Sequence, residues 1–97
     1  MIVGVLGAGQ LGRMLALAGY PLGLQFRFLD PAPDAPAGQL ADLMVGAYDD
    51  AALLEQFVRD VDVVTYEWEN VPVATAHLIG RHVPIFPPPR ALSLIHI

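Results

Sequence analysis

The chain has 97 residues, of which 55% are hydrophobic, and its formal net charge is −5, with ten acidic side chains against five arginines and no lysine. This length suffices for one small domain but not for a complete nucleotide-using enzyme, and so apolar a chain is expected to expose a face that something else covers. The lack of a basic cluster argues against nucleic-acid binding, the lack of lysine excludes a Walker-type phosphate loop, and the lack of cysteine excludes disulfides and cysteine-bound zinc.

Membrane association is not expected either. No run of residues approaches the roughly 18 uninterrupted apolar positions of a membrane span. The first residues lack the basic start of a signal peptide, and glycines interrupt the apolar run at once. We therefore expect a cytoplasmic protein that binds neither membranes nor nucleic acids.

The chain opens with an expected strand over residues 2–6, followed by Gly7, Gly9 and Gly12 and by a helix that starts near Gln10. In a nucleotide-binding βα unit these glycines allow a tight turn, a close backbone approach to a ligand and close packing of the helix on the strand. The free N–H groups and the dipole of the helix then favour an anion. The apolar helical residues fall on one stripe: Leu11, Met14, Leu15 and Ala18.

Two features of this first helix leave alternatives open. It ends either at Gly19 or, after a distorted last turn, at Gly23, which suits a left-handed cap. Arg13 in the first turn opposes the helix dipole at a cost of a few tenths of a kcal/mol. We expect this cost to be offset by a ligand phosphate or by a nearby carboxylate such as Asp30 or Asp42.

The remaining elements alternate between strands and helices. A second strand over residues 25–29 precedes a proline-rich loop over 31–36, one helical turn within 38–42 and a third strand over 43–46. Asp49 or Asp50 caps a second helix, and a fourth strand over 61–66, a third helix over 73–80 and a short fifth strand over 83–86 follow. This alternation predicts an α/β fold, a Rossmann-like parallel sheet flanked by helices.

Ligands of such sheets bind beyond the carboxyl ends of the strands. Asp30 lies there, 23 positions after Gly7 (30 minus 7), close to the roughly 20 residues at which dinucleotide folds place a ribose-binding acid. A nicotinamide-dependent dehydrogenase is therefore one hypothesis. The alternative is that Asp30 only initiates a turn with the proline that follows it.

Two further carboxylates follow the fourth strand. Glu67 and Glu69 are two positions apart, so in an extended chain they point the same way, and they could hold hydroxyls, an amine or a cation. The alternative is a solvated loop. His77 and His82 have no metal-ligand pattern around them, and we expect both to be surface or packing residues.

Several segments in their order and spacing resemble one family. They are the run from Gly7 to Leu15, Leu29-Asp30-Pro31, Pro36-Ala37, Ala41-Asp42, Tyr48-Asp49-Asp50, the run from Asp62 to Pro72, and Pro89-Arg90-Ala91-Leu92. The sequence is similar to the N-terminal domain of carboxyaminoimidazole ribonucleotide synthetases, which are ATP- and bicarbonate-using ligases of purine biosynthesis in the ATP-grasp superfamily. Trp68, Pro88 and residues 93–97 depart from the family pattern.

The resemblance implies a division of the chain and a substrate site. Residues 1–86 would form the Rossmann-like pre-ATP-grasp domain, and residues 87–97 a linker with a truncated or non-native tail. Gln10, Leu11 and Glu67 would contact aminoimidazole ribonucleotide, with Glu69 and Asn70 supporting the loop, and no catalytic residue would lie in this chain. The resemblance favours this ligase over an NAD(P)-binding oxidoreductase domain, and a fragment without activity is a third possibility.

The resemblance also implies which partners and cofactors to expect. The substrates would be aminoimidazole ribonucleotide and bicarbonate, the latter activated by ATP as carboxyphosphate. ATP and Mg²⁺ would be bound in the full-length enzyme by domains outside this chain, so that the fragment alone would be inactive. The full-length enzyme is expected to be a homodimer.

Overall fold

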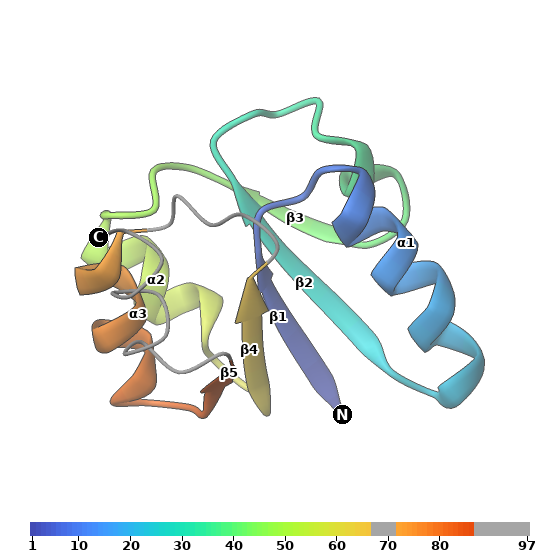
Figure 1. Ribbon diagram of the computed structural model, residues 1–97. Helices are drawn as coiled ribbons and strands as arrows, with labels where there is room; N and C mark the ends of the chain where they lie inside the picture. Colours follow the sequence, from blue (N-terminus) through green and yellow to red (C-terminus); the bar gives the residue numbers. More distant parts are fainter. Residues whose placement is uncertain (67–71, 87–97) are drawn as a thin grey trace.

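The computed structural model describes residues 1–66 and 72–86, and these form a parallel sheet between two layers of helices (Figure 1). The strands lie in the order β3-β2-β1-β4-β5, with bounds β1 (Ile2–Leu6), β2 (Gln25–Asp30), β3 (Asp42–Val45), β4 (Val63–Tyr66) and β5 (Ile85–Phe86). One face carries α1 (Gln10–Gly19) and the 3₁₀ helices η1 (Tyr20–Leu22) and η2 (Pro36–Gln39), and the other carries α2 (Ala51–Phe57) and α3 (Val73–Gly80). The predicted Rossmann-like α/β fold is confirmed.

The sheet is covered by helices on both faces, which explains why its middle strand β1 is apolar along its whole length. Toward α2 and α3, fully buried Leu6 and Val64 pack in one cluster with Phe57 and Ile79. Toward α1 and η2, the cluster is built on the strand residues that alternate with these, together with small helical residues: Val3, Val5, Phe26, Phe28, Ala16 and Ala37. The pleat therefore sends successive residues of each strand into two different cores.

The predicted bounds of β1 and α3 agree with the structure residue for residue. Both of the endings expected for the first helix, at Gly19 and at Gly23, correspond to a feature of the structure. The α-helix ends at Gly19, η1 follows, and Gly23 closes the segment at φ 82, a left-handed conformation that glycine adopts without strain. Asp50, rather than Asp49, caps α2 by accepting a hydrogen bond from the Leu53 N–H at 3.2 Å.

Other boundaries differ from the prediction because the backbone turns there. The fourth strand begins at Val63, two residues later than expected, because Asp60 has φ 65 and the N–H of Val61 bonds to the carbonyl of Val58. The fifth strand begins at Ile85 because the N–H of Val83 still bonds back to α3, at the carbonyl of Ile79.

The segments around β3 also shift toward the N-terminus. The expected helical turn within 38–42 is the 3₁₀ helix η2, which starts at Pro36, where the fixed φ of proline suits a first helical position. Strand β3 then begins at Asp42, which pairs with Arg27 of β2, and it ends at Val45, opposite Asp30.

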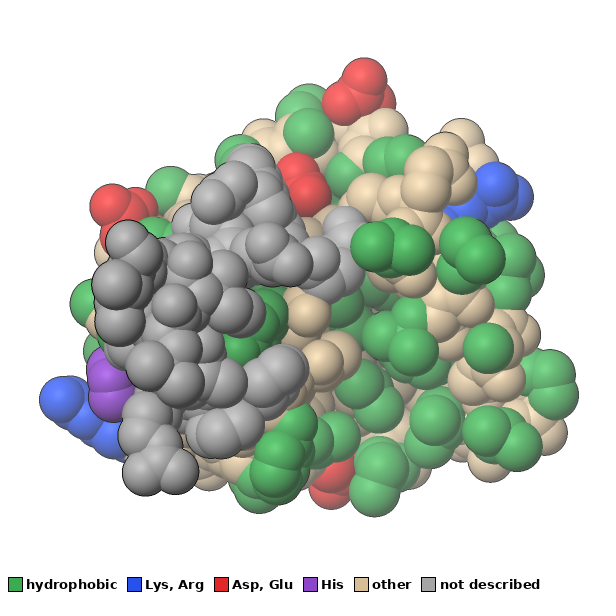
Figure 2. Space-filling model, in the orientation of Figure 1, with side chains coloured by type: hydrophobic (Ala, Val, Ile, Leu, Met, Phe, Trp, Pro, Cys, Tyr) green, Lys and Arg blue, Asp and Glu red, His purple; other side chains and the backbone are tan. Residues whose placement is uncertain are grey.

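Helix α1 lies against the sheet through its small residues. Gly12, Ala16 and Gly19 are its buried positions, and a Cβ atom built on Gly19 would come within 2.4 Å of the Phe26 ring. The large apolar side chains of α1 point outward, where Leu11 and Met14 remain 65% and 62% exposed. Figure 2 shows hydrophobic side chains gathered over the part of the surface that α1 occupies in Figure 1.

Candidate functional site

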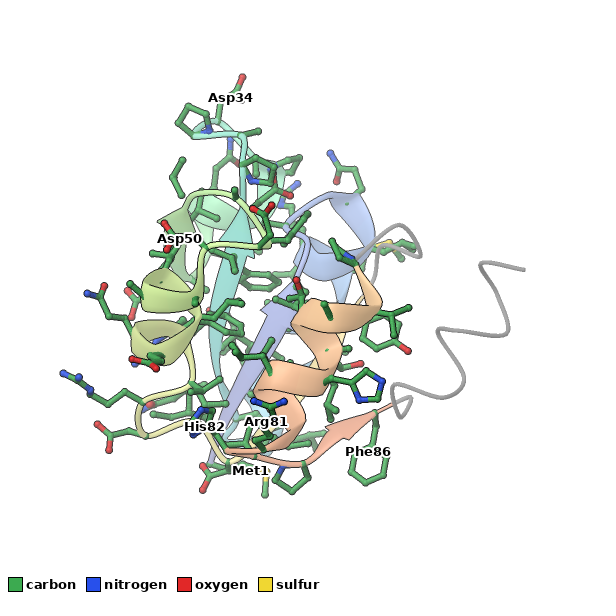
Figure 3. All side chains as sticks on the ribbon, turned by 90° about the vertical axis from the view of Figure 1, so that its left-hand side faces the viewer. Met1, Asp34, Asp50, Arg81, His82 and Phe86 are labelled. Atoms are coloured by element: carbon green, nitrogen blue, oxygen red, sulfur yellow. The ribbon has the colours of Figure 1, made fainter. Side chains whose placement is uncertain are left out.

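The carboxyl ends of the three central strands meet at one edge of the sheet. The strand register sets Leu6 of β1 between Leu29 of β2 and Tyr66 of β4. Figure 3 shows the two ends of the molecule, with Asp34 and Asp50 at this carboxyl edge and Met1 at the opposite edge. The carboxyl edge is the one at which parallel α/β sheets bind their ligands.

The glycine turn joins β1 to α1 at this edge. Gly7 has φ 98, which a residue with a Cβ atom rarely adopts, and its N–H donates to the carbonyl of Leu29 at 2.8 Å. Gly9 is the extended N-cap residue, and its carbonyl accepts the first helical hydrogen bond from the N–H of Arg13 at 3.0 Å. The predicted job of Gly7 in the tight turn is therefore confirmed, and Gly12 is buried, as close packing of the helix requires.

The predicted substrate-binding residues have been placed only in part. Gln10 and Leu11 form the start of α1, directly after the turn, and both are exposed at the carboxyl edge. Glu67, with Glu69 and Asn70, lies outside the described residues. The residue before Glu67 is Tyr66, which pairs with Leu6 next to the turn, so the chain leaves β4 beside the glycine turn.

The structure gives a definite role to Asp30. Its Oδ2 accepts a hydrogen bond from the N–H of Ala8 at 2.9 Å, and its Oδ1 accepts one from the N–H of Ala32 at 2.9 Å. The second bond, from two residues further on, is the pattern of an Asx turn and supports the interpretation of Asp30 as a turn initiator. Sequence reasoning missed the bond to Ala8, because only the pairing of β1 with β2 brings these residues together.

The loop after β2 is fastened to the glycine turn at a second point. The N–H of Ala37 in η2 donates to the carbonyl of Ala8 at 2.8 Å, and Ala35 and Ala37 are buried beneath α1. Both backbone polar groups of Ala8 are thus used inside the protein, the N–H by Asp30 and the carbonyl by Ala37. The turn between β1 and α1 is therefore held at Ala8 by Asp30 of β2 and by Ala37 of η2.

Two polar side chains near this edge have buried atoms without a hydrogen-bond partner in the described part of the chain, the Tyr66 hydroxyl and Arg13 Nε. Desolvation of Tyr66 by burial raises the pKa of its phenol above the usual 10.0, so the group is neutral at physiological pH. Neither Asp30 nor Asp42, the two carboxylates expected to offset Arg13, forms an ion pair with it in the described part of the chain, and Asp42 lies at the opposite edge of the sheet. A ligand phosphate as the partner of Arg13 stays a prediction.

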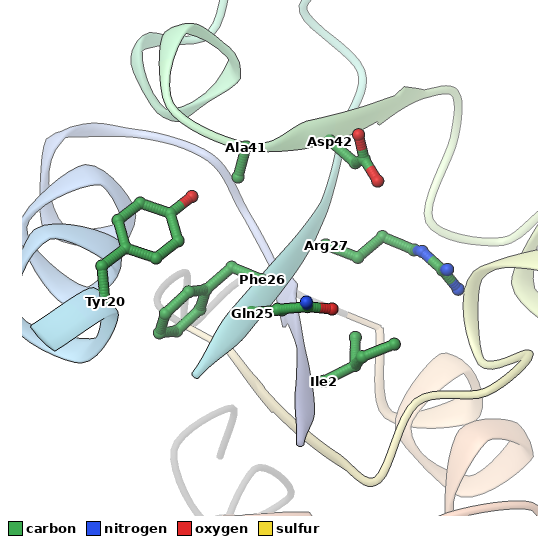
Figure 4. A pocket seen from close by; sticks show the side chains of 7 residues that line it. All are labelled: Ile2, Tyr20, Gln25, Phe26, Arg27, Ala41 and Asp42. Atoms are coloured by element: carbon green, nitrogen blue, oxygen red, sulfur yellow. The ribbon is translucent and has the colours of Figure 1, made fainter. Parts of the chain in front are cut away.

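The hollow drawn in Figure 4 lies at the other edge of the sheet. It has a volume of about 240 Å³ and is lined by the first residues of β1 and β2 together with Tyr20, Ala41 and Asp42. Arg27, in its wall, donates to the carbonyls of Phe57 at 2.9 Å and Arg59 at 2.6 Å and so satisfies the end of α2. Its guanidinium has a structural role, and this hollow is remote from the glycine turn.

Residues 1–66 and 72–86 contain no group of three or more His, Asp or Glu side chains that could hold a metal ion. None of the helices in the described ranges has the length and apolar character needed to cross a membrane. His77 and His82 are both exposed, as expected for surface residues.

Comparison with known proteins gives consistent matches. The model of the ribonucleotide synthetase pre-ATP-grasp domain matches residues 1–96. N5-carboxyaminoimidazole ribonucleotide synthase of Pseudomonas aeruginosa is 49% identical over 94 residues, which are 97% of this chain and 26% of that protein. The chain therefore spans about a quarter of the length of its curated relatives from Pseudomonas aeruginosa and Brucella melitensis.

Solved structures agree with this result. The crystal structure of N5-carboxyaminoimidazole ribonucleotide synthetase from Thermus thermophilus superposes with a TM-score of 0.93 at 55% identity, covering 95% of this chain and 26% of that one. The Staphylococcus aureus synthetase, solved in complex with ADP, has a TM-score of 0.89 at 33% identity, covering 97% of this chain and 26% of that one.

Proposed function

Because the chain belongs to the ribonucleotide synthetase pre-ATP-grasp family, we propose that it forms the ribonucleotide-binding part of an ATP-dependent ligase. The reaction proposed is the carboxylation of aminoimidazole ribonucleotide with bicarbonate in purine biosynthesis. The observation that carries this proposal is the 49% identity over 94 residues with a protein named for the carboxylated product. The glycine turn at the carboxyl edge supports it, since that edge is where such sheets hold nucleotides.

Within this domain the start of α1 and the segment after β4 form the proposed substrate site. Gln10 and Leu11 would contact the ribonucleotide at the N-terminus of α1, where the helix dipole favours its phosphate. Glu67 would accept hydrogen bonds from a ribose hydroxyl or from the amine, because a carboxylate repels phosphate. These groups bind and orient the substrate, and none of them is proposed to be catalytic.

ATP and Mg²⁺ are proposed to bind in the parts of the full-length enzyme that this chain lacks. The Staphylococcus aureus relative was solved with ADP, which supports the use of ATP by the longer proteins. Bound there, ATP supplies the energy that activates bicarbonate. The division at residue 86, the homodimer and the cytoplasmic location stay predictions.

The test is an assay of a full-length enzyme that carries this domain. We expect phosphate release from ATP to require both aminoimidazole ribonucleotide and bicarbonate, and the isolated 97-residue chain to show no such activity. Calorimetry of the isolated chain should show no binding of ATP or NAD at micromolar concentration. Phosphate release that does not depend on the ribonucleotide would contradict the proposal. Tight NAD binding would support the oxidoreductase alternative, which the family match disfavours.

A further inference from the structure

The carboxylate of Asp30 accepts a hydrogen bond from a backbone N–H group of the glycine turn. Its Oδ2 lies 2.9 Å from the N of Ala8, the residue between the first two glycines, and its Oδ1 lies 2.9 Å from the N of Ala32. A charged acceptor makes such bonds about twice as strong as bonds between neutral groups. The turn therefore already contains an anion, and that anion comes from the protein itself.

This internal anion has a consequence for ligand binding. In a dinucleotide-binding turn the backbone N–H groups and the helix N-terminus face the pyrophosphate of the ligand. Here the N–H of Ala8 is bonded to Asp30, so a ligand phosphate at that position would displace a hydrogen bond and meet a carboxylate. A phosphate is better accommodated further along, at the start of α1, where Gln10 and Leu11 are exposed.

Asp30 also links two segments that a ligand at this edge would need in fixed positions. One oxygen holds the turn that leads into α1, and the other holds the loop that leads into η2. The bond from the Ala37 N–H to the Ala8 carbonyl at 2.8 Å closes this arrangement from the other side. Loss of the carboxylate would release the Ala8 N–H and leave the turn held by two backbone bonds, from the Gly7 N–H to Leu29 and from the Ala37 N–H to Ala8.

We propose that Asp30 is a positioning residue that fixes the glycine turn, so that the start of α1 is preorganised for the ribonucleotide. This inference rests on the proposed function. A turn that populates other shapes lowers the apparent affinity in proportion to the fraction of competent molecules. The effect should fall on substrate binding and not on the chemistry of the bound complex, because the Asp30 oxygens are engaged by the backbone N–H groups of Ala8 and Ala32.

The test uses Asp30→Asn in a full-length enzyme that carries this domain. Asparagine keeps the size of the side chain, but it has one oxygen in place of two, so it must turn its NH₂ group toward one of the two N–H donors. We expect the KM for the ribonucleotide to rise about tenfold, the scale of one lost hydrogen bond to a charged group, with kcat and the KM for ATP unchanged. Hydrogen exchange of the backbone around residues 7–9 should become faster.

Asp34→Asn is the matched control, since Asp34 is an exposed carboxylate of the same loop and its replacement removes the same charge. It should leave both KM values unchanged. If Asp30→Asn does not fold, Asp30→Glu tests the positioning role instead, because it keeps the charge but moves the oxygens by one methylene. We expect this variant also to raise the KM for the ribonucleotide.

The outcomes separate this inference from the proposed function. A wild-type enzyme that uses the ribonucleotide, together with Asp30 variants whose KM is unchanged or whose kcat alone falls, would overturn the positioning role and leave the function intact. A wild-type enzyme without ribonucleotide-dependent activity would overturn both.

Discussion

Helices α1 and α2 flank the same sheet but bury different kinds of side chain. Helix α2 buries the large residues Leu54 and Phe57, whereas α1 buries Gly12, Ala16 and Gly19. The sheet residue that faces each helix accounts for the difference: Phe26 of β2 lies against Gly19 of α1, where a Cβ atom would come within 2.4 Å of its ring, so α1 must present small residues there. On the other face Gly4 of β1 makes room for the Phe57 ring of α2, because a Cβ atom at Gly4 would lie only 2.9 Å from that ring.

The two helices also begin differently. The side chain of Asp50 caps α2, whereas Gly9 offers α1 no side-chain cap. An N-terminus without a side-chain cap suits a helix whose first turn is proposed to serve a ligand. We infer that packing and capping stabilise α2, while α1 is placed chiefly to hold the start of a binding site.

The largest expected effect comes from removing the side chain through which α2 packs. Phe57→Ala deletes a fully buried ring and should lower the free energy of unfolding by about 3–5 kcal/mol, measured by urea denaturation of the chain. Leu17→Ala on α1 is the control, since that side chain is 51% exposed, and its effect should stay within about 0.5 kcal/mol. Equal losses from the two variants would contradict the contrast between the helices.

A matched pair of substitutions tests the close packing of α1. Ala16 is fully buried, so Ala16→Leu must push the helix from the sheet and should cost about 2–3 kcal/mol of unfolding free energy. Ala18→Leu makes the same change two residues on, at an exposed position, and should be nearly neutral. Denaturant midpoints that fall equally for both would show that α1 does not lie as described.

The role proposed for the carboxyl edge is tested by Glu67→Ala in a full-length enzyme. The change should lower kcat/KM for the ribonucleotide by about 1.5–3 kcal/mol, the scale of a hydrogen bond to a charged group, and should leave the KM for ATP unchanged. His77→Ala, at an exposed position of α3, is the control and should be neutral. Unchanged ribonucleotide kinetics in the Glu67 variant would remove that residue from the site.

The smallest effect concerns the cap of α2. Asp50→Ala removes the acceptor of the Leu53 N–H and should lower the unfolding free energy by about 1 kcal/mol. Asp49→Ala removes a neighbouring exposed carboxylate that does not cap the helix, so its thermal midpoint should hardly move. If the two variants melt together, the capping bond contributes no measurable stability.

Much of the fold could be predicted because local signals agree with tertiary packing. The apolar run of β1 and the pattern of α3 gave correct bounds, and the position of the turn followed from Gly7, Gly9 and Gly12. The stripe of Leu11, Met14 and Leu15 identified a helix but not the face that meets the sheet. The face that meets the sheet carries Gly12, Ala16 and Gly19. Hydrophobic periodicity does not identify it, because these small residues are buried for their size.

The candidate site could be predicted less completely. Parallel strands end at the same edge of a sheet, so the sequence could predict that the start of α1 and the end of β4 share the carboxyl edge. The bond from Ala8 to Asp30 was not, because it depends on β1–β2 register and on a carboxylate whose local turn pattern is already satisfied by Ala32. Sequence spacing suggested a ribose ligand for this carboxylate, and the structure shows backbone N–H partners.

The most direct test of the account is a crystal structure of a full-length enzyme carrying this domain with aminoimidazole ribonucleotide bound. We predict the ribonucleotide at the carboxyl edge of the sheet, in contact with Gln10, Leu11 and Glu67, with Asp30 still bonded to the N–H of Ala8. A ribonucleotide bound in the hollow of Figure 4, at the amino ends of β1 and β2, or bound without contact to this domain, would contradict the account.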